Sequence, residues 1–395
     1  MAIFVGVGSS HNKQAADAAE EVFLQASQPL NGHSPSFMML FASPTTYSQE
    51  ELVKILKSKS PQSVLIGCST SGEITPAGST DNSVALMAIY SDAIRFVPGI
   101  GHDIKKDPRQ AGRDMATDIQ KRSGGEKPKT ALMLPDGLAG NGADIVRGVL
   151  DVFGEDFCLA GGAAGDDFLF QKTFEYIDDQ VVSGSAVGVG LYGNFSFGIG
   201  VRHGWMSIGT SRTATKSKSN ILYELDGKPA IEMYEDQFGK DKKVISQKEP
   251  LARLAITYPL GIAIPGKDEY LIRDPITVDE QGAITCAAEI PEGSQVYIMI
   301  GSREEAIEAA EDASRKAIEQ VKGKEIKAIF LFNCIARKKL LMAKKQEEID
   351  RIRAVFGPQI PLIGFYTYGE QAPLGGAIAT CSFHNETDVL FVLAE

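Results

Sequence analysis

The chain has 395 residues, of which 43% are hydrophobic and 23% charged, as in soluble globular proteins long enough for two or more domains. Its net charge of −11 argues against a nucleic-acid or anionic-membrane partner. The five cysteines form no C-x-x-C pair, and no apolar run reaches the ~20 residues that span a bilayer. We therefore expect a cytoplasmic protein with reduced thiols.

The first part of the chain alternates strands and helices. Apolar runs predict strands, and amphipathic stretches predict helices between them. The strands are expected at 3–7, 37–42, 63–67, 83–90, 94–100, 130–134 and 157–160, and the helices at 13–27, 48–57, 107–122 and 141–153. No G-x-G-x-x-G follows the first strand, which argues against a dinucleotide-binding domain.

The middle of the chain is rich in short strands with Gly or Asp at the turns. These strands are expected at 173–177, 185–191, 195–201, 208–214, 220–225, 252–258, 269–272, 283–286 and 295–300, with one short helix at 230–238. The last part alternates again, with a helix that begins at a capping box after Ser302 and another over 336–356. The predicted fold class is α/β (mixed α+β), with two pseudo-repeated halves, mixed sheets and a β-rich middle, divided into domains 1–210 and 211–395.

One short phrase occurs twice. Residues 65–73 read LIGCSTSGE and residues 362–370 read LIGFYTYGE, and six of the nine positions are identical. Both copies follow an apolar run, within the order strand, helix, strand, G-x-x-T-x-G-E, strand. A fainter third copy surrounds Gly161-Gly162-Ala163-Ala164-Gly165-Asp166. The sequence therefore predicts an internal duplication with functional loops after buried strands.

These motifs resemble the FIST family (F-box and intracellular signal transduction proteins). The amino-terminal half of that family is similar to Gly67–Glu73, Gly161–Asp166 and Val201-Arg202-His203-Gly204-Trp205. Its carboxyl-terminal half resembles Leu225-Asp226-Gly227-Lys228-Pro229-Ala230, Tyr258-Pro259-Leu260-Gly261, Arg273-Asp274, Phe332–Arg337 and Gly364–Glu370. The resemblance covers nearly the whole chain in the right order, and it implies a sensory domain that binds a small metabolite such as an amino acid. It also implies a histidine kinase or cyclic-di-nucleotide signalling protein as partner, and some relatives are described as haem proteins that sense nitric oxide.

The two Gly-Glu turns are candidate ligand contacts. Glu73 and Glu370 would accept hydrogen bonds from a ligand ammonium, and Gly72 and Gly369 would let a ligand approach the backbone. The alternative is structural: each Gly supplies a positive φ and each Glu caps backbone N–H groups. Thr70, Thr367 and Tyr366 belong to the same turns.

Further candidates lie at the end of the apolar run 328–332. Asn333 and Arg337 would suit a carboxylate or phosphate at a helix start, although Arg337 could instead pin the neighbouring turn or Glu370. Arg202 would line a pocket between the two halves. Cys68 and Cys334 occupy equivalent loop positions, where a nucleophile and a small buried hydrophobe are the two alternatives.

Three other features carry weaker signals. His203 is the best haem ligand among five histidines, yet an isolated histidine is usually an ordinary polar residue. The Gly-rich bend 136–142 could bind an anion at a helix start but lacks the Lys-Ser/Thr of a P-loop, and Asn141 as an N-cap is simpler. Asp166 and Asp167 are too few acids for a metal site.

The interpretation that unites these observations is a stand-alone cytoplasmic FIST-type sensor. It would bind an amino acid or another small carboxylate through Cys68, Thr70, Gly72, Glu73, Arg202, Asn333, Cys334, Arg337, Tyr366, Thr367, Gly369 and Glu370, and signal through a separate protein. No catalytic constellation and no required cofactor is identifiable. The alternatives are a cysteine-dependent hydrolase acting through Cys68 or Cys334, and a haem-based nitric oxide sensor acting through His203.

Overall fold

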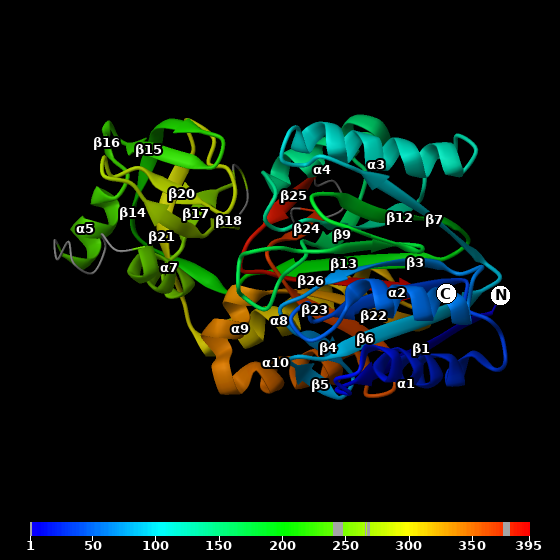
Figure 1. Cartoon of the computed structure of the whole chain (residues 1–395). Helices are drawn as coiled ribbons and strands as arrows, with labels where there is room; N and C mark the ends of the chain where they lie inside the picture. Colours follow the sequence, from blue (N-terminus) through cyan, green and yellow to red (C-terminus); the bar gives the residue numbers. More distant parts are fainter. Residues whose placement is uncertain (1, 240–247, 265, 267–268, 374–379) are drawn as a thin grey trace.

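The computed structural model describes residues 2–239, 248–264, 266, 269–373 and 380–395. Three six-stranded sheets form the body of the molecule, and an eight-stranded sheet belongs to a smaller domain beside it (Figure 1). The sheets of the body mix parallel and antiparallel neighbours. The predicted mixed α/β fold class is therefore confirmed.

The body contains three copies of one unit, which we call units 1, 2 and 3. Unit 1 comprises β1 (Ile3–Ser10), α1 (Ala15–Ser27), η1 (Gln28–Leu30), β2 (Phe37–Ala42), α2 (Gln49–Lys59), β3 (Val64–Ser69), β4 (Glu73–Thr75), β5 (Gly78–Thr80) and β6 (Val84–Ser91). Unit 2 comprises β7 (Ile94–Gly101), α3 (Pro108–Arg122), β8 (Thr130–Pro135), α4 (Gly142–Phe153), β9 (Leu159–Gly162), β10 (Glu175–Ile177), β11 (Gln180–Val182) and β12 (Ala186–Gly193). Unit 3 comprises β13 (Ser196–Arg202), α8 (Arg303–Gln320), β22 (Ile326–Cys334), α9 (Ile335–Leu341), η2 (Met342–Lys344), α10 (Lys345–Phe356), β23 (Leu362–Thr367), β24 (Glu370–Pro373), β25 (Cys381–His384) and β26 (Asp388–Ala394). The faint third copy of the repeated phrase thus belongs to a complete unit.

The units are interlocked by their hairpins. Hairpin β4–β5 of unit 1 pairs with β23 of unit 3, hairpin β10–β11 of unit 2 pairs with β3 of unit 1, and hairpin β24–β25 of unit 3 pairs with β9 of unit 2. Each six-stranded sheet therefore takes four strands from one unit and two from another. Every unit therefore completes the sheet of a neighbour.

The repeated phrase has a packing reason. In each unit, two parallel strands are joined by a crossover that contains a helix, and a glycine lies on the second strand where the first strand comes close. A Cβ atom on Gly67, Gly161 or Gly364 would lie 2.0, 1.9 or 2.3 Å from the carbonyl oxygen of Leu40, Met133 or Leu331, respectively. Only glycine allows this approach, so its position in Leu-Ile-Gly is set by the sheet.

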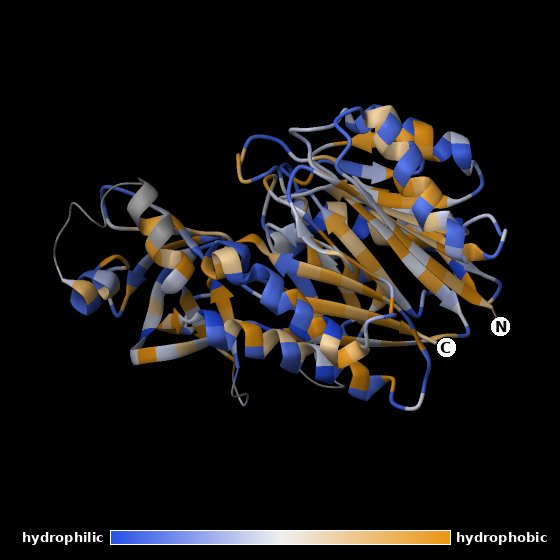
Figure 2. Cartoon of the chain, turned by 90° about the horizontal axis from the view of Figure 1, so that it is seen from below, coloured by the Kyte–Doolittle hydropathy of each residue, from blue (hydrophilic) through white to orange (hydrophobic). Residues whose placement is uncertain are grey.

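The inner faces of the three sheets share one core. The ring of Phe365 lies 4.4 Å from that of Phe41 and 6.0 Å from that of Phe332, measured between centroids, and Leu134 of unit 2 belongs to the same cluster. Figure 2 shows the strands of the body as largely hydrophobic and the helices as hydrophilic on their outer surfaces. None of the described helices combines the length and apolar character needed to cross a bilayer.

The smaller domain is inserted into unit 3 between β13 and α8, and we call it the inserted domain. It comprises β14 (Trp205–Lys218), β15 (Ile221–Leu225), β16 (Lys228–Pro229), α5 (Glu232–Phe238), α7 (Lys248–Thr257), β17 (Leu260–Ala263), β18 (Tyr270–Arg273), β19 (Pro275–Val278), β20 (Ile284–Cys286) and β21 (Gln295–Gly301). Its first strand, β14, pairs with its last strand, β21, and Trp205 at the start of β14 lies opposite Gly301 at the end of β21. The two connections to the body therefore lie side by side. Strand β14 spans residues 210 and 211, and the two-domain division predicted there stays a prediction.

Two predicted elements differ from the structure. The strand expected at 252–258 is wrong, because most of that segment belongs to helix α7, in which Leu251 and Ala255 are buried at helical spacing. The single helix expected over 336–356 is broken at Met342, whose φ of 51° lies in the left-handed region and turns the chain between α9 and α10.

Candidate functional site

The loops that follow β3, β9 and β23 meet at one end of the body. The backbone N–H of Ser71 donates to the carbonyl of Tyr366 (3.1 Å), Gly165 donates to Ser69 (2.9 Å), and Tyr368 donates to Ala163 (3.1 Å). The tertiary fold therefore brings the two repeated phrases together and adds the third copy to them.

Both predicted glutamates lie inside these turns and are inaccessible. Glu73 accepts from the Ser83 N–H (3.3 Å) and from the hydroxyls of Thr70 and Ser83. Glu370 accepts from the N–H (3.2 Å) and hydroxyl (2.7 Å) of Thr387 and from the Thr367 hydroxyl. Burial raises the pKa of each carboxyl to about 8. These contacts are the structural alternative that the sequence left open.

A third glutamate, Glu175, holds the equivalent place in unit 2. It pairs with Cys68 as Glu73 pairs with Phe365 and Glu370 with Gly162, and it accepts from the Ser185 N–H (3.3 Å). Burial raises its pKa well above the ordinary value. The repeated phrase did not reveal Glu175, because a longer loop, residues 163–174, separates it from Gly161, the equivalent of Gly67 and Gly364.

The other predicted residues of the two Gly-Glu turns also have structural contacts within the turns. Gly72 and Gly369 have φ values of 117° and 153°, and their N–H groups donate to the hydroxyls of Thr70 and Thr367 (3.3 Å each). Tyr366 is fully buried, with the Lys338 ammonium 4.7 Å from its ring centroid. None of these side chains is exposed for a ligand.

Arg337 lies at the centre of a buried ionic network. Its guanidinium donates to Glu348 (2.6 Å), to Asp388 (2.7 Å) and to the carbonyl oxygens of His203 (2.5 Å) and Ala306 (2.7 Å). Asn333 donates its amide to the other oxygen of Glu348 (2.7 Å). Arg337 therefore connects several elements of unit 3 to one another. Its acidic partners are Glu348 and Asp388, and not Glu370.

The two candidate cysteines are buried. Cys68 and Cys334 have almost no exposed surface, and burial together with neighbouring carboxylates raises the pKa of both thiols well above the ordinary value. A nucleophilic cysteine needs the opposite, an accessible thiolate of lowered pKa. The described residues therefore give no support to the hydrolase alternative.

Arg202 and His203 lie at the junction between β13 and the inserted domain. Arg202 forms an ion pair with Glu269, and His203 Nδ1 accepts from the Trp205 N–H (2.9 Å). Burial lowers the pKa of His203 to about 3. The adjoining groove is lined by five carboxylates, those of Glu269, Glu305, Glu308, Glu311 and Asp312. The groove also contains Arg202 and Arg351, each already paired with one of these carboxylates, and so acidic a lining is not the apolar slot that haem needs.

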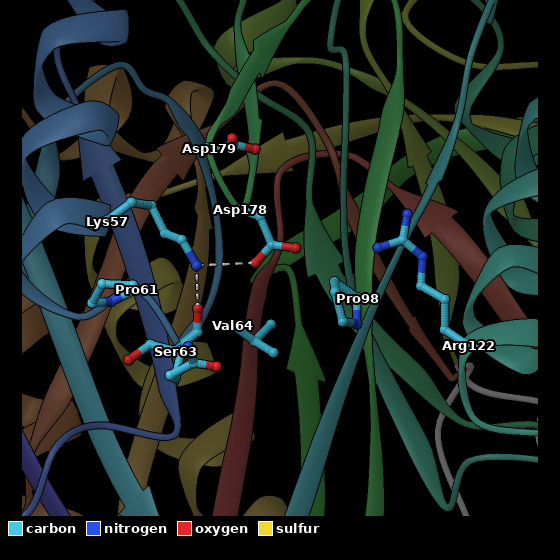
Figure 3. A pocket seen from close by; sticks show the side chains of 9 residues that line it. Lys57, Pro61, Ser63, Val64, Pro98, Arg122, Asp178 and Asp179 are labelled. Atoms are coloured by element: carbon cyan, nitrogen blue, oxygen red, sulfur yellow. Dashed lines mark hydrogen bonds and ion pairs between the residues drawn. The ribbon is translucent and has the colours of Figure 1, made fainter.

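An open groove of about 600 Å³ lies at the opposite end of units 1 and 2 (Figure 3). The Lys57 ammonium points toward Asp178 (3.4 Å), and Arg122 lies on the far side of Pro98 and pairs with Asp118 (3.0 Å). Because its cations are already paired with carboxylates, this groove offers little free charge to a ligand.

A further cavity lies between unit 2 and the inserted domain. It measures about 540 Å³, within the size range of small-molecule sites, and we call it the interdomain cleft. One wall is the Gly-rich bend 136–142 at the carboxyl end of β8, where ligands of α/β proteins commonly bind. The opposite wall belongs to the inserted domain and includes Ser219, Asn220, Ile276, Cys286 and Ala287.

Aromatic side chains form a further part of the lining of the cleft. Phe170 stacks on Tyr368 with 4.8 Å between ring centroids, and Phe383 lies beside them. Several of these residues expose large apolar side chains: Phe170 is 55% exposed, Ile276 45% and Leu138 38%. Exposed apolar surface around a concave site is typical of ligand binding.

The bend itself presents unused hydrogen-bond donors. Asn141 caps α4 by accepting from the Ala143 N–H (3.3 Å), as the simpler sequence interpretation expected. Among the described residues, however, the N–H groups of Gly137, Ala139, Gly140, Asn141 and Gly142 have no acceptor. Unpaired backbone N–H groups at a helix start suit an anionic group. No group of three or more His, Cys, Asp or Glu side chains in the described part of the chain is arranged to hold a metal ion.

The sequence had marked the bend but not the rest of the cleft. Phe170, Tyr368, Phe383, Asn220 and Ile276 come from separate segments of the chain, and their joint role depends on the fold. The one local signal is Phe168-Leu169-Phe170, an apolar run in a loop, where a polar sequence is expected.

Comparison with known families agrees with this architecture. A family model of the FIST N domain matches residues 36–228, and one of the FIST C domain matches residues 230–373. The chain belongs to the FIST family. The resemblance inferred from the motifs is confirmed, and FIST domains form a sensory family.

Relatives of this FIST protein occur in distant organisms. An uncharacterized protein of Methanocaldococcus jannaschii is 25% identical over 86% of this chain and 70% of its own length. Uncharacterized proteins of Mycobacterium bovis and Mycobacterium tuberculosis are each 23% identical, over 96% of both chains. Among solved structures, a chorismatase (TM-score 0.36, 9% identity, 100% of this chain and 98% of that one) and a cyanuric acid hydrolase from A. caulinodans (TM-score 0.33, 9% identity, 100% and 99%) align with it.

Proposed function

We propose that this FIST protein is a sensor that binds a small carboxylate, such as an amino acid, in the interdomain cleft. The observation that carries the proposal is the set of N–H groups of Gly137, Ala139, Gly140, Asn141 and Gly142, which have no acceptor among the described residues and belong to the lining of a cavity of suitable volume. A ligand carboxylate would accept from these N–H groups at the start of α4. Its apolar part would pack on Phe170, Tyr368 and Phe383.

The position of the cleft suggests how binding is reported. The inserted domain forms one wall, and it joins the body through two paired strands that begin and end at Trp205 and Gly301. Gly204, with a φ of 88°, precedes this connection, which suits a hinge. A ligand that contacts both walls binds the closed arrangement better than the open one, and this difference in affinity shifts the population.

The output of the sensor would pass to a separate signalling protein. A partner that distinguishes the closed from the open position of the inserted domain would read the concentration of the ligand. The family resemblance favours a histidine kinase or a cyclic-di-nucleotide enzyme in this role. Neither the hydrolase nor the haem alternative has a supporting observation among the described residues.

The test is a thermal-shift and calorimetric screen of the purified chain against amino acids and other small carboxylates. A ligand at 100 times its Kd should stabilise the protein by about 2.7 kcal/mol. The variant Ala139→Trp should abolish the shift by filling the cleft, whereas Ala77→Trp, at an exposed turn of hairpin β4–β5, should retain it. Equal binding by both variants, or no stabilisation by any carboxylate at millimolar concentration, would refute the proposal.

A further inference from the structure

A single turn recurs in the three units, and one copy breaks the pattern. The turn links the outer hairpin strand to the closing strand, and its middle residue has a left-handed backbone: Asn82 (φ 54°), Gly184 (φ 69°) and Glu386 (φ 57°). Glycine and asparagine adopt this conformation readily, whereas glutamate is strained there. Unit 3 thus has, at this left-handed position, a residue that rarely adopts a positive φ, whereas units 1 and 2 have residues that adopt it readily. Such backbone strain often marks a functional position.

Unit 3 is also the unit that carries the inserted domain. The Glu386 side chain is fully buried and lies within hydrogen-bond reach of Asp274, the residue between β18 and β19 of the inserted domain. Both Glu386 carboxyl oxygens and Asp274 Oδ1 are buried and have no hydrogen-bond donor among the described residues, and the guanidinium of Arg273 joins the two segments by donating to the Phe383 carbonyl (3.2 Å). The strained glutamate therefore serves a contact between the body and the inserted domain.

Two carboxyl groups can share a hydrogen bond only when one of them holds a proton. Burial raises the pKa of Asp274 to about 6. Burial, followed by the charge of Asp274, raises the pKa of Glu386 well above its ordinary value. At neutral pH the pair therefore retains one proton, and at alkaline pH it becomes two buried negative charges that repel each other.

The surroundings of the pair decide how strongly this repulsion acts. The charged and titratable groups that face it from neighbouring elements are Arg273, Arg337, Glu370, Cys334, Cys286 and Tyr234. Arg337 is committed to Glu348 and Asp388, and Arg273 donates to the carbonyl oxygens of Glu289 (2.7 Å) and Phe383 (3.2 Å). Because both guanidinium groups already have other partners, and Glu370 adds a further acid, the second negative charge is poorly compensated.

We propose that Asp274 and Glu386 form a proton-bridged latch, which holds the inserted domain against unit 3 and releases it when the shared proton is lost. The movement would occur about the connection at Gly204 and Gly301, and it would open the interdomain cleft. The latch acts whether or not the cleft binds a ligand, so it is independent of the proposed function.

Trp205, the only tryptophan, is a natural reporter because it begins β14 at this connection and is 3% exposed. The full chain would be titrated from pH 6 to 10 by tryptophan emission and small-angle X-ray scattering, with far-ultraviolet circular dichroism to follow folding. In the wild type we expect a red shift of emission and a larger radius of gyration at alkaline pH, with circular dichroism unchanged. Glu386→Gln should lose this transition, because its amide donates to Asp274 at every pH.

A second variant distinguishes the effect of the Glu386–Asp274 contact from the effect of the left-handed backbone at residue 386. Glu386→Asn matches Asn82 and suits the left-handed backbone, but its side chain is too short to reach Asp274, so the open signals should already be present at pH 7. Asn82→Gly, in the equivalent turn of unit 1, is the control and should behave as the wild type. The proposal is overturned if wild type and Glu386→Gln share the same alkaline transition. It is also overturned if Glu386→Asn keeps the closed signals at pH 7, or if the wild type unfolds without first opening.

Discussion

Replacing Glu73 by glutamine should change how stability depends on pH, because Glu73 is buried and protonated at neutral pH. Its pKa rises from an ordinary value of 4.5 to about 8 in the folded chain. The unfolded chain loses this proton near pH 4.5 and the folded chain only near pH 8, so unfolding releases a proton between these values. The stabilising contribution is therefore complete below pH 4.5 and is lost as pH rises to about 8.

The size of the effect follows from the same shift. At about 1.4 kcal/mol per pKa unit, the wild type loses about 5 kcal/mol of stability from Glu73 between pH 4.5 and 8. Glutamine has no proton to lose, and it can keep the contacts: its carbonyl oxygen accepts from the Ser83 N–H, and its amide donates to the Thr70 hydroxyl. Glu73→Gln should therefore show a shallower pH dependence and greater stability than the wild type at pH 9.

The assay is urea unfolding of the two proteins at pH 5, 7 and 9. Glu280→Gln, at an exposed glutamate of the inserted domain, is the control and should leave the pH profile unchanged. Glu73→Ala should be less stable than Glu73→Gln at every pH, because it leaves the buried Ser83 N–H without an acceptor, at a cost of about 1–3 kcal/mol. An unchanged pH slope in Glu73→Gln would refute the assignment of a protonated Glu73.

Three further predictions concern residues that the sequence had placed in or near a site. Arg337→Ala should lower the free energy of unfolding by about 3–5 kcal/mol, because two buried carboxylates lose their partner; unchanged thermal stability would contradict the network. In the folded chain, iodoacetamide should label the partly exposed Cys158 faster than Cys68, as read by mass spectrometry, and rapid labelling of Cys68 would contradict its burial. Gly364→Ala should destabilise the chain by more than 1 kcal/mol in chemical denaturation, since its Cβ would lie 2.3 Å from a carbonyl oxygen, and a neutral effect would show that the strands can separate there.

The sequence by itself determined the family, the mixed α/β class and the existence of repeats. These depend on local patterns, such as alternating apolar runs and the glycine in Leu-Ile-Gly, which the parallel strands require at Gly67 and Gly364. The N-cap at Asn141 was also readable, because capping involves only neighbouring residues.

Only the tertiary structure decided the roles of the repeated polar residues. A glutamate after Gly72 or Gly369 has the same local sequence whether its carboxyl faces a ligand or a buried turn, and the exchanged hairpins placed it inside. Likewise, Arg337 of α9 forms ion pairs with Glu348 of α10 and Asp388 of β26, which only the tertiary structure brings next to it.

The interdomain cleft joins the bend 136–142 to residues as distant in the sequence as Phe383, and the other contact joins Asp274 to Glu386, so no local pattern predicts either of them. Burial and partnership are properties of the packed chain. The sequence was therefore sufficient to predict the family and the fold class, whereas the packing of the inserted domain against the body determines where a ligand-binding cavity lies.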